Sequence, residues 1–222
     1  FYPMKDGSTG LYYNSSALAA FDLFILKREG AEKKYDTKQI QKAKNYFEVL
    51  SSKEIEILTK SIIAGLPGAE EGYTLDQFRK QLKQYEFVST EDLRENLILF
   101  LEEIIPTAEK LKVKMSIHPD DPPFNLFGIP RVVRTSKDLD FLFKRVPSLY
   151  NGLTYCTGSL GVRKDNNLKQ IFDKFTDRIH FIHLRSIQRE GEGNFFEANH
   201  LEGDVDMFSI VYAIIKEEQK RK

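Results

Sequence analysis

The sequence predicts an α/β fold in which parallel strands alternate with helices. From residue 112 onward, short apolar segments alternate with amphipathic segments of about ten residues, a pattern typical of parallel strands joined by crossover helices. The first 110 residues carry mainly helical periodicity instead. We therefore expect a parallel sheet in the second half of the chain and additional helices in the first half.

The chain opens with an aromatic-rich segment. One further strand is expected within residues 1–13, which contain several tyrosines. Ser15 or Ser16 is then expected to cap a helix that runs to about Glu29, because both are good N-cap residues and Gly30 is a typical helix stop.

Three further helices are predicted from caps followed by apolar residues at helical spacing. A helix is expected to start near Asp36. Ser51 with Glu54, and Thr74 with Gln77, have the spacing of a capping box, in which each cap residue bonds the third helical residue and is bonded by it.

A longer helix is expected from Ser89 or Thr90. Pro106 should kink or end this helix, because proline lacks the backbone N–H that the helix needs. The segment 65–72 is expected to be a loop, and the helices of about 31–88 have the character of an insertion into the sheet domain.

The second half supplies the strands. Their apolar residues alternate or run continuously, and helical stripes separate them. Strands are predicted at 112–117, 152–156 and 178–184, and helices near 138–146, 167–175 and 205–218.

Composition excludes several classes of function. The chain has 222 residues, with 33 Lys and Arg against 33 Asp and Glu, so its formal net charge is zero. That balance argues against broad electrostatic binding to nucleic acid or to a membrane surface. Cys156 is the single cysteine, so no intrachain disulfide is possible and a reducing, cytoplasmic location is expected.

Three potential metal ligands occupy equivalent places in the predicted strands. His118 follows the first strand, Cys156 ends the second and His183 lies near the end of the third. Parallel strands end at the same face of a sheet or barrel, which is where active sites of such folds lie. Two imidazoles and a thiolate meeting there would suit a divalent metal.

Each of these residues also has a structural interpretation. A histidine at a strand end is often a hydrogen-bonded structural residue, and a buried cysteine often acts as a small apolar side chain. The three taken alone leave both interpretations open. Their repeated placement favours the metal site more than their residue types do.

The loops after the strands contain further candidates. Ser159 lies in "CTGSLG", whose glycines allow close approach to a ligand oxygen. Arg185 follows His183 by two residues and could bind a substrate carboxylate, or form a surface ion pair. His200 lies in a polar segment that is either a lid or the start of a helix.

These segments together resemble the mannonate dehydratase family of sugar-acid lyases. The similarity is specific across about residues 90–215 and looser over the helical first third. It rests on four blocks in the family's order: "IHPDDPPFNLFGIPRVV", "GLTYCTGSLG", "RIHFIHLRSI" and "EANHLEGDVDM".

The resemblance implies a (β/α)8 barrel that dehydrates D-mannonate to 2-keto-3-deoxy-D-gluconate. It implies that His118, Cys156 and His183 bind Mn2+ or Fe2+, whereas ligand softness alone would suggest zinc. Arg185 and His200 become substrate contacts by the same resemblance, and a homodimer is expected.

The resemblance also implies that this sequence is part of a longer barrel. The family's Arg-Pro-Asp-His-Gly-His block and its later Pro-Gly-Tyr are absent. No catalytic acid or base is therefore assigned. We expect residues 1–222 to form a single barrel domain that lacks N-terminal and C-terminal parts.

Two alternatives have different requirements. Another metal-dependent sugar isomerase or epimerase on the same barrel would need further carboxylate ligands, for which Asp120, Asp121 and Asp204 are candidates. A non-catalytic protein that binds sugar acids would bind a metal and show no turnover.

Overall fold

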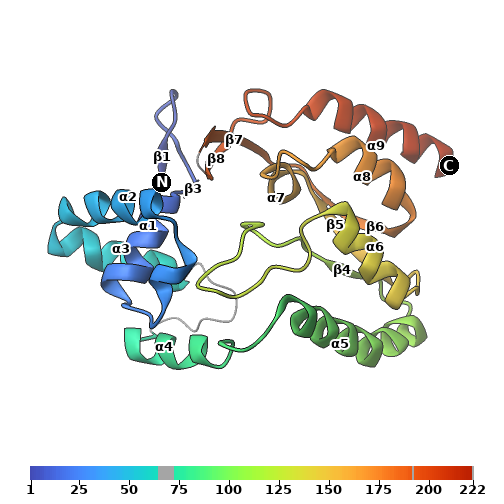
Figure 1. The fold of residues 1–222 in the computed structure, drawn as a ribbon. Coiled ribbons are helices and arrows are strands. Elements are labelled where there is room, and N and C mark those ends of the chain that lie inside the picture. The colour runs from blue at the N-terminus through green and yellow to red at the C-terminus, as the bar shows by residue number, and fades with distance from the viewer. Residues whose placement is uncertain (65–72, 192, 222) are drawn as a thin grey trace. The chain divides into compact units, whose positions relative to one another are not determined.

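The computed structural model describes residues 1–64, 73–191 and 193–221, so the loop predicted at 65–72 lies outside the described residues. The chain divides into two compact units, each drawn in Figure 1. The first comprises Phe1–Tyr13, Ser89–Phe124 and Pro130–Lys222, and the second comprises Asn14–Val88 and Asn125–Ile129.

A three-stranded parallel sheet organises the first unit. Its order is β4 (Met115–Ile117), β5 (Asn151–Cys156) and β6 (Ile179–His183), as Figure 1 shows. The predicted α/β class with parallel strands is confirmed. The first strand is shorter than the predicted 112–117, because Lys112 adopts a left-handed conformation (φ 57°) and caps the preceding helix.

Helices α5 (Thr90–Leu111), α6 (Ser136–Arg145), α8 (Leu168–Phe175) and α9 (Met207–Arg221) supply most of the core around this sheet. Leu153 and Tyr155 of β5 are fully buried and belong to the same cluster. Burying a large apolar side chain contributes about 1.5–3 kcal/mol. Because side chains alternate along a strand, Thr154 and Cys156 point to the opposite face of β5.

Helix α5 begins where the sequence predicts and ends later. Ser89 caps it through a capping box with Asp92. A kink or an end of the helix is expected at Pro106; an end at this residue is wrong, since the helix continues to Leu111. Pro106 and Glu102 are both exposed, so water can reach the Glu102 carbonyl that loses its helical donor.

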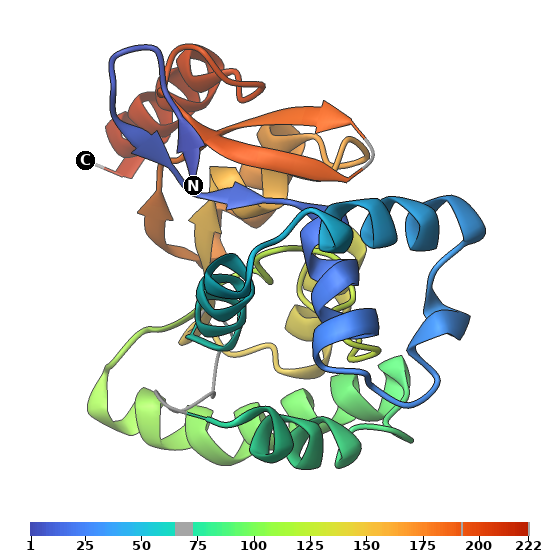
Figure 2. The same ribbon diagram turned by 90° about the vertical axis from the view of Figure 1, so that its left-hand side faces the viewer.

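A second sheet in the first unit was not predicted. Strands β7 (Ser186–Gly191) and β8 (Asn194–Ala198) form an antiparallel hairpin, and β3 (Tyr12–Tyr13) pairs with β8. Figure 2 shows the orange hairpin beside the short blue strand β3. The expected further strand within 1–13 therefore pairs antiparallel to β8 and does not extend the parallel sheet.

Aromatic stacking connects the start of the chain to this hairpin. Strands β1 (Tyr2–Pro3) and β2 (Thr9–Gly10) pair with each other. The Tyr2 ring stacks on Phe196 with centroids 3.6 Å apart, and Tyr13 stacks on Phe195 at 5.1 Å. Such pairs contribute about 0.5–1.5 kcal/mol beyond the area they bury.

The second unit is helical. Its elements are α1 (Ser15–Ala20), a π-helical segment (Phe21–Ile25), a 3-10 turn (Ala31–Lys34), α2 (Thr37–Glu48), α3 (Ser52–Ala64) and α4 (Leu75–Lys83). The caps predicted at Asp36, Ser51 and Thr74 are confirmed by their hydrogen bonds. No helix of the described residues is long and apolar enough to cross a membrane.

The first helix of this unit differs from the prediction at both ends. Asn14, not Ser15 or Ser16, is its cap, and the helical run ends at Ile25. Lys27 then has a φ of 52°, which a continuing right-handed helix does not allow.

Candidate metal centre

His118, Cys156 and His183 lie together at the carboxyl ends of the three parallel strands. One ligand atom from each falls within 4.8 Å of the other two. The Cys156 Sγ atom lies 3.4 Å from Nδ1 of His183, and the two imidazole centroids are 5.8 Å apart. The sequence argument that these residues share one face of the sheet agrees with this arrangement.

Strand register explains the meeting of the three side chains. Cys156 and His183 are direct partners across β5 and β6, and Ile117, one residue before His118, pairs with Leu153. A bulge between Leu153 and Thr154 shifts the pairing so that the ends of β5 and β6 coincide. Without the bulge, the alternation of side chains would turn one of the two ligands away.

A backbone contact orients His118. Its Nδ1 lies 2.7 Å from the carbonyl oxygen of Pro119. Because a carbonyl can only accept, Nδ1 carries a proton, and Nε2 is the nitrogen left for another partner. Backbone carbonyls commonly hold metal-binding histidines in this way.

The pKa shifts of Cys156 and His183 favour metal binding, whereas the pKa shift of His118 favours the imidazolium, which must lose a proton before it can bind a metal. Burial raises the pKa of Cys156, but the His118 ring, Ser159 and the Arg185 charge outweigh it, so the pKa is lowered. The Cys156 hydrogen bond raises the pKa of His118 against the effect of burial. Burial and the Arg185 charge lower the pKa of His183, which favours the neutral imidazole that binds metals.

Arg185 is held between two carboxylates next to this centre. Its Nη2 lies 2.5 Å from Oδ2 of Asp121, and its Nη1 lies 3.3 Å from Oε1 of Glu197. Its Nε is buried and has no hydrogen-bond partner in the described part of the chain. The two ion pairs thus fix the direction of the guanidinium and use two of its five N–H donors.

The turn after β5 holds the backbone of Arg185 through hydrogen bonds from Thr157. Thr157 begins helix α7 (Thr157–Gly161) and is fully buried. Its Oγ1 donates to the Arg185 carbonyl at 2.8 Å and accepts from the Arg185 backbone N–H at 2.9 Å. This pair of bonds sets the path of the chain immediately after His183.

The other predicted substrate contacts have different surroundings. Ser159 is fully buried, its backbone N–H points to the Cys156 Sγ atom at 3.5 Å, and its hydroxyl has no partner among the described residues. His200 is exposed and its Nε2 lies 3.1 Å from the Leu184 carbonyl. Ser159 therefore lies next to the candidate metal ligand Cys156. His200 instead contacts the backbone of Leu184, the residue that follows His183.

The three aspartates considered as further ligands are engaged elsewhere. Asp120 accepts from the backbone N–H groups of Val132 and Val133, both at 2.8 Å. Asp121 pairs with Arg185. In the described chain, no carboxylate joins the two histidines and the cysteine in one group of ligands.

Asp204 is likewise occupied. It accepts from the backbone N–H of Arg189 at 2.8 Å and pairs with its Nε at 3.1 Å. The isomerase or epimerase alternative therefore gains no ligand from these aspartates.

Sequence reasoning did not single out Thr157, Gly158 and Glu197. Gly158 and Thr157 lie in the loop already noted for its glycines and hydroxyls, and the signal was their position directly after Cys156. Glu197 lies on β8, in a hairpin that the sequence pattern did not indicate, so no local signal connected it to Arg185.

Comparison with known proteins identifies the family. The family model of D-mannonate dehydratase (UxuA) matches residues 1–222. The chain belongs to the mannonate dehydratase family. It is 48% identical over 221 residues to a mannonate dehydratase of Marinomonas sp. (strain MWYL1) and 46% identical over 220 residues to that of Saccharophagus degradans (strain 2-40).

The chain spans little more than half the length of these mannonate dehydratases. The matches cover 99% of this chain but 56% and 55% of the two relatives. The crystal structure of mannonate dehydratase from Streptococcus suis serotype 2 is similar with a TM-score of 0.57 and 36% identity, over 60% of this chain and 39% of that one. These values support the mixed α/β fold.

Proposed function

We propose that this chain belongs to an enzyme that dehydrates D-mannonate to 2-keto-3-deoxy-D-gluconate. The observation that carries the proposal is the convergence of His118, Cys156 and His183, with ligand atoms within 4.8 Å, at the ends of three parallel strands. Membership of the family supports the choice of reaction, and the three converging side chains support a metal site at which it would take place.

The donor set fits a divalent cation. A thiol whose pKa is lowered and two imidazoles are ordinary ligands of transition metals. We propose that His118, Cys156 and His183 hold Mn2+ or Fe2+, a choice that rests on the family. Such an ion would supply a Lewis acid beside the substrate carboxylate and hydroxyl groups.

Arg185 is proposed to bind the substrate carboxylate through the Nη1 and Nη2 hydrogens that Asp121 and Glu197 do not use. Asp121 and Glu197 hold the guanidinium in place, so it needs little reorganisation when the substrate binds. Ser159 offers a buried hydroxyl next to Cys156, and His200 is proposed as a more distant contact.

The reaction removes a proton from C2 and hydroxide from C3. The C2 proton lies next to a carboxylate, so negative charge develops on the carboxylate oxygens as a base removes it. A fixed guanidinium stabilises that charge. An acid then assists loss of the C3 hydroxyl as water, and the enol tautomerises to the keto acid. No residue of the described chain is assigned as the acid or the base.

The remaining expectations stay predictions of this proposal. We propose a (β/α)8 barrel domain to which residues 1–222 contribute β4, β5 and β6, with the helices of about 31–88 as an insertion. A homodimer and a cytoplasmic location are predicted as well.

The proposal is tested with protein expressed from the complete gene, by following 2-keto-3-deoxygluconate formation from D-mannonate with Mn2+ or Fe2+. Cys156→Ser should lose bound metal, measured by elemental analysis, together with product formation. Tyr155→Phe is the matched control, because Tyr155 is the neighbouring residue on the same strand and packs on the opposite face. The control should keep both metal and activity.

Each alternative predicts a different result. Formation of an isomer or epimer without loss of water would favour the isomerase class. Bound metal without turnover under any condition would favour a protein that binds sugar acids. Full activity of Cys156→Ser in a metal-depleted sample would remove the centre from the proposal.

A further inference from the structure

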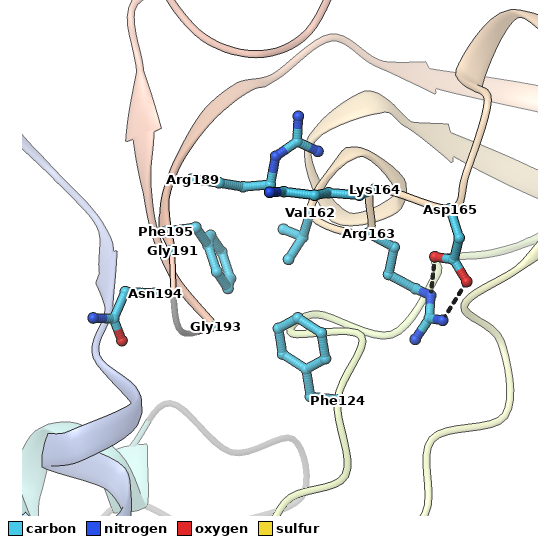
Figure 3. A pocket seen from close by; sticks show the side chains of 10 residues that line it. All are labelled: Phe124, Val162, Arg163, Lys164, Asp165, Arg189, Gly191, Gly193, Asn194 and Phe195. Atoms are coloured by element: carbon cyan, nitrogen blue, oxygen red, sulfur yellow. Dashed lines mark hydrogen bonds and ion pairs between the residues drawn. The ribbon is translucent and has the colours of Figure 1, made fainter. Parts of the chain in front are cut away.

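A pocket of about 410 Å³ lies beside the β7–β8 hairpin in the first unit. Figure 3 shows it between the hairpin, the segment after α7 and Phe124 in the loop after β4. None of His118, Cys156, His183 and Arg185 lines it. Its volume falls in the range of small-molecule sites.

The walls of the pocket are apolar and held in place. Val162 and Phe195 are buried, and the rings of Phe124 and Phe195 point into the space in Figure 3. Both rings pack against Tyr13, with centroids 6.2 Å and 5.1 Å away. An apolar or aromatic body would therefore meet pre-formed walls.

Two arginines at the pocket have their charges compensated. Arg163 makes a two-pronged bond to Asp165 at 2.9 Å and 2.6 Å, drawn as dashed lines in Figure 3. Arg189 pairs with Asp204 and donates to the Gly161 carbonyl at 2.7 Å. These bonds fix both guanidinium groups but leave little net charge.

Lys164 supplies the uncompensated charge. It lines the pocket and is exposed, and no acidic group pairs with it in the described part of the chain. Among the described residues, the charged groups that line the pocket are Arg163, Lys164, Asp165 and Arg189. Once Arg163 is paired with Asp165 and Arg189 with Asp204, these described groups leave one positive charge, that of Lys164.

We propose that this pocket binds an organic anion with an aromatic or other apolar body, at a site separate from the metal centre. The body packs between Phe124, Val162 and Phe195, and the anionic group meets Lys164. Burial of the body provides most of the affinity, while the charge selects anions over neutral analogues.

The test uses 8-anilino-1-naphthalenesulfonate as probe and its neutral counterpart N-phenyl-1-naphthylamine, which has the same body without the sulfonate. Fluorescence titration of the full chain should show saturable binding at one site. Lys164→Gln should weaken sulfonate binding about threefold to fivefold, and Lys164→Glu about tenfold, as expected for a charge pair that involves an exposed lysine. Binding of the neutral probe should change less than about twofold in both variants.

Three controls test whether the probe binds at this pocket and nowhere else on the surface. Lys169→Gln removes an exposed lysine on α8 that pairs with Asp173, and should leave probe binding unchanged. Phe208→Ser removes an exposed aromatic side chain on α9 and should also have no effect. D-mannonate should not displace the probe.

The proposal is overturned if Lys164→Gln binds the sulfonate as wild type does, or if Phe208→Ser abolishes binding. Displacement by D-mannonate would show that the pocket is part of the sugar-acid site. Because no metal ligand is altered, these results are independent of whether the proposed dehydratase activity is found.

Discussion

The guanidinium of Arg185 crosses directly over Gly158. A Cβ atom at position 158 would lie 2.0 Å from Nε of Arg185, a distance that no side-chain contact allows. Only glycine at position 158 leaves room for the Arg185 side chain in this position. In this position the guanidinium pairs with Asp121 and Glu197.

Gly158→Ala should displace Arg185 while leaving the metal ligands in place. A misplaced substrate contact of this kind costs on the order of 100-fold in kcat/KM. Steady-state kinetics on D-mannonate and elemental analysis of bound metal measure the two effects separately. Gly161→Ala is the control in the same helix, since its Cβ would meet only side chains, at 3.2 Å and beyond. Equal losses in both variants would contradict this role of Gly158.

Thr157→Val should destabilise the fold by about 1–3 kcal/mol. The substitution keeps the shape of the side chain but leaves the backbone N–H and carbonyl of Arg185 without their partner in a buried site. Denaturant unfolding measures the change. Thr157→Ser keeps the hydroxyl and should retain most of the stability, so a serine variant as unstable as the valine variant would argue against the hydrogen bonds as the cause.

Metal binding should raise the thermal stability of the protein. A ligand present at about 100 times its dissociation constant stabilises the folded state by about 2.7 kcal/mol. For a chain of this size that corresponds to roughly 5–10 °C in Tm. Differential scanning calorimetry with Mn2+ and then with a chelator tests this. His183→Ala should show no metal-dependent shift, and a shift equal to that of wild type would exclude His183 as a ligand.

Tyr13 should make stability fall at alkaline pH. Burial raises the pKa of Tyr13 from 10.0 to about 12, against a smaller opposing effect of Arg131. Because the folded pKa lies above the unfolded one, this contribution is fully present below about pH 10 and is lost as pH rises towards 12. Each pH unit in that window removes about 1.4 kcal/mol.

Unfolding experiments between pH 9 and about pH 12 measure this loss. Tyr13→Phe removes the ionisable group and should flatten its part of the decline, although burial raises the pKa of Tyr155 in the same direction. Identical pH profiles for wild type and Tyr13→Phe would show that Tyr13 does not ionise differently in the two states.

Local patterns predicted several elements correctly for a common reason. The caps at Asp36, Ser51, Thr74 and Ser89 depend on side chains that bond to the backbone within three residues. Local patterns were insufficient where contacts between distant residues determine how far an element extends.

Pro106 remains inside α5 because the helix packs through Ile98, Leu101 and Ile105 on its other side.

The sequence by itself determined which residues stand at the ends of three parallel strands, because strand periodicity and the direction of crossover connections are local properties. It thereby indicated His118, Cys156 and His183. Only the tertiary structure decided the register that joins Cys156 to His183 and the hairpin that brings Glu197 to Arg185. Those contacts depend on a bulge and on aromatic packing between segments far apart in the chain, and such packing energy leaves no periodic signal in either segment.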